Sequence, residues 1–221
     1  GPVLRQSTRS QAYEAALTSL TKRGLLYGCI CSRRDIAEAA SAPQEGASPV
    51  WGPDGLVYPG SCRPMDGGAP LAGPARRLNM AAALTGCSEI AFQELTDDLK
   101  TPKNHIQKAA QFIDNIGDVV LARRDGAAAY HLAVVVDDAA QDITHVLRGA
   151  DLLSATPIHA LLQHLLGYPK PCYHHHRLIR DSQGKRLAKR DDAKAIAKFR
   201  GEGASPDDIR AMVGLPLRSK L

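Results

Sequence analysis

The sequence predicts an α/β fold, and two kinds of pattern support this prediction. Apolar residues recur at helical spacing between residues 13 and 20, and again over residues 156–166. Residues 134–136 are a Val-Val-Val run that stops at Asp137 and Asp138, as a buried strand of a parallel sheet does. Because ligands in open α/β sheets bind beyond the carboxyl ends of the strands, the two acids are site candidates. The alternative is a strand followed by a solvated acidic turn.

The N-terminal stretch predicts a strand, a helix and a second extended segment. Residues 3–5 fit a short strand. Thr8 and Gln11 fit a capping box at the start of the helix, and Gly24 fits its end. Residues 25–31 are apolar and extended.

A predicted helix over residues 33–40 leads into residues 41–75, which are rich in Pro, Gly, Ala and Ser and show no clear period. Long irregular stretches of this kind inside a compact domain are usually functional or mobile. Residues 116–124, with a turn at residues 125–126, predict a hairpin that leads into a strand from Tyr130.

Beyond a basic loop at residues 184–190, the sequence predicts two short helices. Gly201 closes the first helix. Ser205 is a good cap for the second, because Pro206 follows it at the first helical position.

Composition narrows the classes of protein. The chain has 221 residues, of which 44% are hydrophobic, enough for one large domain or two small ones. Its net charge of +5 fits a polyanionic partner such as tRNA. We expect a cytoplasmic protein without a membrane span, because the sequence shows neither a signal peptide nor a long apolar run. Five cysteines, two of them one residue apart, favour a metal site over disulfides.

Cys29, Cys31 and Cys62 are candidate metal ligands. Three thiolates supply three positions of a tetrahedral zinc site, and the Pro-Gly turn before Cys62 returns the chain toward the other two. A fourth ligand is needed, and Tyr58 is the nearest oxygen donor. Tyrosine is a rare ligand because the metal must lower its pKa, ordinarily about 10. The alternative is three unrelated buried thiols.

Tyr130 and Arg148 are candidate ligands for an amino-acid substrate. An arginine forms a bidentate fork with a carboxylate, and a tyrosine hydroxyl fixes an amine or an oxygen. The chain between them is long enough for a strand, a turn and a return, which allows both side chains to face one pocket. The alternatives are a core aromatic for Tyr130 and a surface salt bridge for Arg148.

Lys189 in the basic loop is a candidate for contact with phosphate. Adenylate formation passes through a negatively charged transition state, which a positioned ammonium stabilises. The alternative is a solvated basic turn. Nearby, His174, His175 and His176 cannot all bind one ion, because consecutive strand residues point to opposite faces. We expect alternate members of the three to face an ATP pocket and solvent.

The ordered phrase at residues 136–157, Val-Asp-Asp-Ala-Ala-Gln-Asp-Ile-Thr-His-Val-Leu-Arg-Gly-Ala-Asp-Leu-Leu-Ser-Ala-Thr-Pro, resembles the class I glutamyl-tRNA synthetases. Residues 184–190 lie where that family carries its Lys-Met-Ser-Lys-Ser type loop. Within the group, the chain is most similar to the glutamyl-queuosine tRNA(Asp) synthetases, a shortened family without an anticodon-binding domain. The resemblance covers nearly the whole chain.

This resemblance implies a partial class I synthetase Rossmann-like catalytic domain. It would comprise residues 1–28 and 76–190, with a zinc-binding insertion at residues 29–75 and a C-terminal helical segment at residues 191–221. The family's His-Ile-Gly-His type motif does not occur before Val3, so we expect the chain as written to be inactive alone.

The resemblance also assigns roles to the candidate residues. It implies glutamate binding by Tyr130 and Arg148, and a catalytic, ATP-contacting role for Lys189. In the same loop Arg186 and Ala188 replace the usual Lys and Ser, which removes a hydroxyl contact. The family carries Zn²⁺ on a Cys-x-Cys, Tyr-x-x-x-Cys pattern, which here implies four ligands: Cys29, Cys31, Tyr58 and Cys62.

The predicted activity is activation of glutamate with ATP and Mg²⁺, then transfer of the glutamyl group to queuosine in the anticodon of tRNA(Asp), by a monomer. One alternative is the catalytic fragment of a glutamyl-tRNA synthetase, which the short stretch after Gly214 disfavours. An alternative of another class is a non-catalytic zinc-containing RNA-binding module. The presence of Tyr130, Arg148 and Lys189 together disfavours that alternative.

Overall fold

The computed structural model describes residues 3–41, 48–64, 74–180, 184 and 195–216. The chain divides into two compact units, Gly1–His175 and His176–Leu221. The candidate metal ligands and the candidate substrate ligands Tyr130 and Arg148 all belong to the first unit.

Three strands of the first unit form an antiparallel sheet in the order β1 (Leu26–Cys29), β4 (Ala75–Leu78) and β7 (Val120–Ala122). Every residue of β1 is buried, as its apolar sequence predicted. The register pairs Cys29 with Ala75. The last residue of β1 therefore lies beside the point where the chain returns from the insertion.

A second sheet has the strand order β6 (Pro102–Lys108), β5 (Glu89–Leu95), β9 (Cys172–His176) and β8 (His145–Gly149). Strands β5 and β6 form an antiparallel hairpin, whereas β5 and β9 run parallel. The parallel pair and the helices around it confirm the predicted α/β class. Strands β8 and β9 also bring together residues far apart in the sequence.

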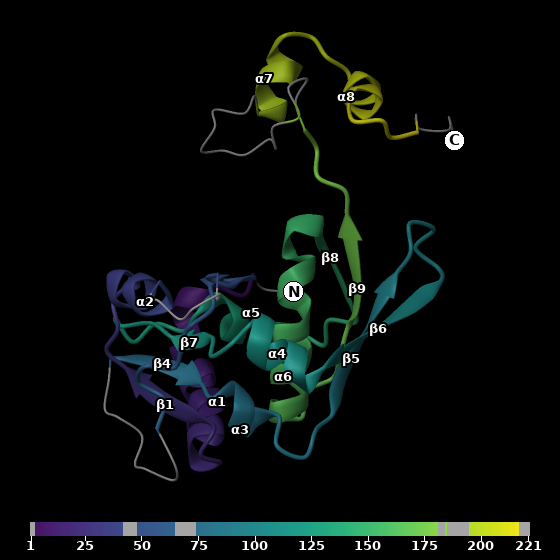
Figure 1. Ribbon diagram of the computed structural model, residues 1–221. Coiled ribbons are helices and arrows are strands. Elements are labelled where there is room, and N and C mark those ends of the chain that lie inside the picture. The colour runs from purple at the N-terminus through teal and green to yellow at the C-terminus, as the bar shows by residue number, and fades with distance from the viewer. Residues whose placement is uncertain (1–2, 42–47, 65–73, 181–183, 185–194, 217–221) are drawn as a thin grey trace. The chain divides into compact units, whose positions relative to one another are not determined.

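Helices α1 (Ser10–Lys22), α5 (Tyr130–Ala140) and α6 (Thr156–Leu166) form the centre of the core. Helix α6 packs against β5, α5 and α1, and it lies between the three-stranded sheet and the β5–β6 hairpin (Figure 1). Almost all of α6 is buried, as expected for a helix that is apolar on most sides. The helices predicted over residues 13–20 and 156–166 are confirmed.

The strand predicted at residues 134–136 is wrong, because these valines lie inside α5. Leu132, Val135 and Val136 are buried at helical spacing, on the side of α5 that packs against α1 and α6. A valine costs a helix less than about 0.7 kcal/mol, whereas burying its side chain contributes about 1.5–3 kcal/mol. Packing therefore overrides the β preference of the run.

The hairpin predicted before Tyr130 is also shorter than expected. After β7 the chain turns and returns only as far as a single bridge between Ala122 and Ala128. Ala129 then has extended backbone and precedes the first residue of α5. Tyr130 therefore begins a helix, not a strand.

The N-terminal expectations are partly wrong. Residues 3–5 form no strand, and a 3-10 turn, Gln6–Thr8, follows them. The Thr8 hydroxyl donates to the Arg5 carbonyl at 2.9 Å, so it does not cap α1. Gly24, with φ of 70°, does follow the helix end in the left-handed conformation that glycine favours.

The described part of the insertion contains regular elements that its composition did not predict. Helix α2 (Arg33–Ala40) is confirmed and carries a capping box from Ser32. Strands β2 (Trp51–Gly52) and β3 (Gly55–Leu56) form a hairpin within the stretch predicted to be irregular. Three further short elements of the first unit are α3 (Met80–Ala83), α4 (Ala109–Asn115) and η2 (Ala150–Ala155).

The second unit contains both predicted C-terminal helices, α7 (Ile196–Gly201) and α8 (Pro206–Met212). The Ser205 side chain accepts from the Asp208 N–H, and the Asp208 carboxylate accepts from the Ser205 N–H, which confirms the predicted cap. In the stretches of chain that the structure describes, every helix is too short or too polar to cross a membrane.

Candidate functional site

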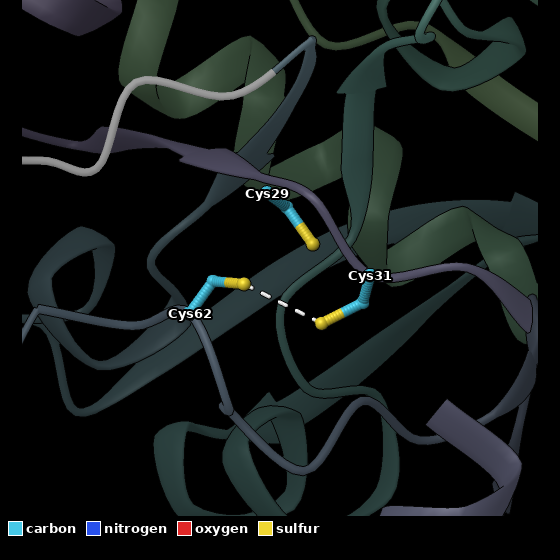
Figure 2. A group of neighbouring side chains, drawn as sticks. All are labelled: Cys29, Cys31 and Cys62. Atoms are coloured by element: carbon cyan, nitrogen blue, oxygen red, sulfur yellow. Dashed lines mark hydrogen bonds between the residues drawn. The ribbon is translucent and has the colours of Figure 1, made fainter. Parts of the chain in front are cut away.

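Cys29, Cys31 and Cys62 meet in the first unit, in the arrangement that Figure 2 shows. Cys29 ends β1, and Cys31 lies just before the Ser32 cap of α2. Cys62 comes from the segment after β3. With Tyr58 these residues make up the cysteine cluster, which is packed into a small core of its own around Tyr27 and Ala75.

The donor atoms of the cysteine cluster point at one another. All three sulfurs lie within 4.8 Å of each other, and Cys31 Sγ is 3.4 Å from Cys62 Sγ. Tyr58 Oη lies 3.6 Å from Cys29 Sγ and 3.5 Å from Cys31 Sγ. It also accepts from the Cys62 N–H at 2.7 Å.

The thiols of the cysteine cluster differ in acidity. Burial raises the pKa of Cys31. Burial also acts to raise the pKa of Cys62, but hydrogen bonds from Tyr58, the Ile30 main chain and the other two thiols outweigh it, so its pKa is about 7. Burial and the three thiols raise the pKa of Tyr58. One thiolate is therefore favoured near neutral pH, and thiolate is the form that binds metal.

The cysteine cluster fits a tetrahedral metal site. Zinc–sulfur bonds of about 2.3 Å place the sulfurs of such a site roughly 3.8 Å apart, a separation close to the distances found here. Three sulfurs and one phenol oxygen supply four donors. These residues suit Zn²⁺ through soft sulfur ligands, whereas Mg²⁺ prefers oxygen.

Two contacts tie the cysteine cluster to the rest of the first unit. The guanidinium of Arg77 lies 3.9 Å from the centre of the Tyr58 ring, in a cation–π contact. The buried carboxylate of Asp118 accepts from Tyr27, Arg63 and the Met80 N–H. Sequence reasoning missed Asp118, because a lone acid after Gly117 carries no signal of its partners.

Arg148 is the centre of a second buried group of polar side chains. It lies on β8 and donates from Nε to His175 Nε2 at 3.2 Å. Its Nη1 lies 3.0 Å from His159 Nδ1, and its Nη2 donates to Thr156 Oγ1 at 2.7 Å. A weaker bond at 3.3 Å joins Nη2 to the Leu152 carbonyl. Arg148 therefore does not form the surface salt bridge that was the alternative interpretation of its sequence position.

These contacts limit how Arg148 meets a substrate. A guanidinium has five N–H groups, and the four bonds to His175, His159, Thr156 and Leu152 use all but one of them, on Nη1. A bidentate fork needs two free N–H groups on one edge. In this arrangement a substrate carboxylate can accept one hydrogen bond from Arg148 and is attracted by its positive charge. A bidentate fork requires Arg148 to break one of its hydrogen bonds within the protein.

Tyr130 approaches the same group from helix α5. Its ring is 49% exposed, so it is not a core aromatic. The ring packs at a steep angle against His131 and His159, with centroids 5.6 Å and 5.7 Å apart. Tyr130 and Arg148 thus both contact His159, although they come from α5 and β8.

Further histidines extend this group in two directions. His159 Nε2 lies 2.9 Å from His131 Nδ1, and His131 Nε2 lies 2.7 Å from a carboxylate oxygen of Asp54. On the other side, His175 Nδ1 lies 2.7 Å from Glu94 Oε1. We call the whole set the Arg148 network, and its members are Asp54, Glu94, His131, Arg148, Thr156, His159 and His175.

Two histidines of the Arg148 network are held neutral. Burial lowers the pKa of His159 to about 2, and the charge of Arg148 acts in the same direction. Burial also lowers the pKa of His175, although its hydrogen bond to Glu94 acts the other way. His159 is 1% exposed, so a second positive charge beside Arg148 would have no solvent to stabilise it.

Sequence patterns indicated these residues only in part. Consecutive residues of β9 alternate as expected, since His175 is buried while His176 is exposed. His131 and His159 lie on apolar helical stretches, where sequence alone favours a core role. Asp54 lies in a two-residue turn, where acids are common because their side chains bond to the turn's own backbone. The sequence therefore carried no sign of its partner His131, 77 residues away.

The remaining predicted residues have other placements. Asp137 is buried in α5, where its carboxylate accepts from Tyr13 at 2.7 Å and from Arg9 at 3.1 Å. It therefore joins the N-terminal segment to the core and is not a residue at the end of a strand. Burial raises the pKa of Asp138, with Arg148 acting to lower it. Lys189 lies outside the described residues.

Comparison with known proteins places this arrangement in context. Residues 96–216 match the family described as tRNA synthetases class I (E and Q), catalytic domain. A glutamyl-Q tRNA(Asp) synthetase from Rhodobacter capsulatus is 55% identical over 97% of this chain and 76% of its own length. One from Nocardia farcinica is 42% identical over 99% of this chain. The chain spans 65% of the Nocardia protein, and 57% of a similar one from Geobacter sulfurreducens.

Solved structures agree on the fold. A glutamate tRNA ligase from Elizabethkingia meningosepticum, in complex with its amino acid, matches with a TM-score of 0.65 over 96% of this chain and 45% of that one, at 22% identity. A glutamate-tRNA synthetase from Elizabethkingia anophelis matches with a TM-score of 0.60 over 86% of this chain and 38% of that one, at 23% identity. Identities this low establish the fold alone.

Proposed function

The chain belongs to the glutamyl-Q tRNA(Asp) synthetases within the class I tRNA synthetase family, and on that premise we propose that the natural protein activates glutamate with ATP and Mg²⁺ and transfers the glutamyl group to queuosine in the anticodon of tRNA(Asp). The observation that carries this proposal is 55% identity to the Rhodobacter capsulatus protein over 97% of this chain. The enzyme would act as a monomer in the cytoplasm, where tRNA is found.

In this proposal Arg148 and Tyr130 bind glutamate. The partly buried cation of Arg148 would attract a carboxylate of the substrate, and the exposed Tyr130, which also contacts His159, would bind the same substrate. Lys189 would stabilise the charge that develops on the phosphates of ATP, a role assigned through the family resemblance. Mg²⁺ would enter with ATP as part of the substrate complex.

We further propose that the cysteine cluster holds one structural Zn²⁺ in an insertion at residues 29–75. The nucleotide-binding fold would comprise residues 1–28 and 76–190, followed by a helical segment at residues 191–221. A closed four-ligand site without a position for water is typical of structural zinc. The Arg77 and Asp118 contacts would then transmit that stability to the core.

The proposal is tested by acylation assays on the natural full-length protein with labelled glutamate. The three acceptors are tRNA(Asp) that carries queuosine, tRNA(Asp) without it and tRNA(Glu). We expect label on the first alone. Label on tRNA(Glu), or equal label on both forms of tRNA(Asp), would overturn the queuosine assignment and leave glutamate activation standing. Absence of ATP–pyrophosphate exchange with glutamate would overturn the activation step itself.

A further inference from the structure

The Arg148 network contains a chain of hydrogen bonds that starts at the proposed glutamate site and ends in the insertion. From Arg148 Nη1 the chain passes through His159 and His131 to Asp54, with separations of 3.0, 2.9 and 2.7 Å. Asp54 lies in the turn between β2 and β3, and its side chain is 46% exposed. The two histidines between Asp54 and Arg148 are buried.

Only one placement of protons satisfies all of these bonds. The Arg148 guanidinium donates and never accepts, so His159 Nδ1 is an acceptor and its proton is on Nε2. That proton points at His131, so His131 Nδ1 accepts and its proton is also on Nε2. His131 then donates to the Asp54 carboxylate. A doubly protonated His131 would reverse the order and turn an N–H of His159 toward Arg148.

The same reasoning applies on the other side of Arg148. Its Nε donates to His175 Nε2, so the His175 proton is on Nδ1 and is donated to Glu94. Arg148 is therefore flanked by two neutral imidazoles, and each side ends at a carboxylate. A carboxylate in direct contact would neutralise the guanidinium, whereas a neutral acceptor holds it in place and leaves its charge available.

We propose that Asp54 is a positioning residue for glutamate recognition, which acts through His131 and His159 to hold Arg148 in a fixed orientation while its charge remains free for an anionic substrate. This inference rests on the proposed glutamate-binding role of Arg148. Asp54 is the outer end of this chain of bonds, and its solvent-accessible carboxylate accepts from His131, which holds that ring against His159. The hairpin of the insertion thereby contributes to a site in the core of the unit.

The test compares Asp54→Ala with Asp54→Asn in the natural full-length protein. Alanine removes the acceptor of His131, so nothing holds that ring against His159, and once the ring turns away either of its nitrogens can carry the proton. The asparagine amide oxygen still accepts from Nε2 and keeps the order of donation. Asp125→Ala is a matched control, because Asp125 is another exposed acid in a turn, and its carboxylate contacts Arg123 and the Ala127 N–H instead of a histidine.

Two readouts separate positioning from a merely structural role. The first is the nitrogen chemical shift of His131 and His159 in protein with labelled histidine, which reports the proton position on each ring. The second is the KM for glutamate against the KM for ATP. We expect Asp54→Ala to produce mixed proton positions on His131 and to raise the KM for glutamate about three- to tenfold, as for loss of one hydrogen bond. The KM of Asp54→Ala for ATP should stay near the wild-type value. For Asp54→Asn and Asp125→Ala, the KM values for both glutamate and ATP should stay near wild type.

Several outcomes would overturn the inference. A wild-type His131 with its proton on Nδ1, or on both nitrogens, contradicts the assigned order. So does an Asp54→Ala protein whose proton positions are unchanged, or one whose proton positions shift while the KM for glutamate does not. If Arg148→Lys also leaves the KM for glutamate unchanged, the proposed glutamate role of Arg148 has failed. A variant that fails to fold is distinguished from one that loses positioning, because an unfolded Asp54→Ala protein would lose ATP binding as well as glutamate binding.

Discussion

The cysteine cluster and the Arg148 network are both buried groups of polar side chains, but they satisfy their polar atoms differently. In the Arg148 network, donors and acceptors alternate from Asp54 to Glu94, so the protein completes the set itself. In the cysteine cluster, three thiols and one phenol face one another at 3.4–3.6 Å. Thiols are weak donors and weak acceptors, so this cluster gains little until a cation joins it.

The difference teaches how each region is expected to respond to change. A group that depends on an added ion should lose its order when the ion is removed. A group completed by the protein should instead change by the worth of single hydrogen bonds, and it should respond to protons. The following expectations are ordered from the largest effect to the smallest.

The largest effect is expected from loss of the metal. We expect one zinc per purified chain, and we expect Cys62→Ala to lose it, because a tetrahedral site needs all of its ligands. Apparent binding free energies of structural zinc in small peptides are about 10–16 kcal/mol, so the insertion should become accessible to protease. Metal analysis and limited proteolysis measure both. Cys87→Ala is the control, since that thiol lies outside the cysteine cluster. A zinc-free chain with a protected insertion would contradict the metal assignment.

Arg148→Lys should have the next largest effect. A lysine ammonium is a single point donor and cannot serve His159, His175 and Thr156 in their present positions. Loss of a charged hydrogen bond costs about 1.5–3 kcal/mol, which is roughly ten- to a hundredfold in glutamate affinity. Steady-state kinetics should show this rise in the KM for glutamate and little change for ATP. Arg123→Lys, at an exposed ion pair, is the control. Equal effects on both substrates would mean that Arg148 is structural.

A pH effect should distinguish the two regions further. His159 has a folded-state pKa of about 2, below its ordinary value of 6.5. Below pH 6.5 the unfolded chain therefore binds a proton that the folded chain does not, and the free energy of unfolding falls as the pH falls. The loss from this group is about 2 kcal/mol at pH 5.

Denaturant unfolding at pH 7 and pH 5 measures this loss. In His159→Gln the amide can accept from Arg148 and donate to His131, but it has no proton to gain. The difference in unfolding free energy between the two pH values should therefore shrink by about 2 kcal/mol relative to wild type. His175 contributes to both proteins alike, because burial lowers its pKa as well. An unchanged pH dependence would show that His159 is protonated in the folded chain.

The two regions also differ in how far the sequence predicted them. The cysteine cluster was predicted in full, because its ligands lie close together in sequence and thiols have few other roles at that spacing. Of the Arg148 network only Arg148 itself was predicted, together with Tyr130, which packs against two of its histidines. Its other members come from four separate elements and from the turn between β2 and β3. A buried histidine looks the same in sequence whether it packs or relays a hydrogen bond.

The fold shows a similar division between local and distant signals. The caps at Ser205 and the helix end at Gly24 were predicted correctly, since both are set by neighbouring residues. The Val run at residues 134–136 was assigned to a strand, because its β preference is local while its burial against α1 and α6 is not. The buried Asp137 was misplaced for the same reason, as its partners Arg9 and Tyr13 lie 128 and 124 residues away.

The smallest effect is expected at Thr156, which tests how redundant the Arg148 network is. Thr156 Oγ1 accepts from Arg148 Nη2 at 2.7 Å and lies 3.0 Å from His175 Nε2, and the Leu152 carbonyl lies 3.3 Å from the same arginine nitrogen. Thr156→Val has nearly the same shape and removes only the hydroxyl. Because Leu152 remains as an acceptor, we expect a loss of about 0.5–1.5 kcal/mol, or about two- to tenfold in the KM for glutamate.

Thr156→Ser keeps the hydroxyl and removes the methyl group, so it should retain the wild-type KM for glutamate despite a small loss of packing. The pair of variants therefore separates hydrogen bonding from shape at a fully buried position. If Thr156→Val raised the KM for glutamate as much as Arg148→Lys does, each acceptor around Arg148 would be indispensable. The Arg148 network would then depend on a single partner, as the cysteine cluster is expected to depend on its metal. If serine instead behaved like valine, packing of the methyl group rather than the bond to Arg148 would account for the role of Thr156.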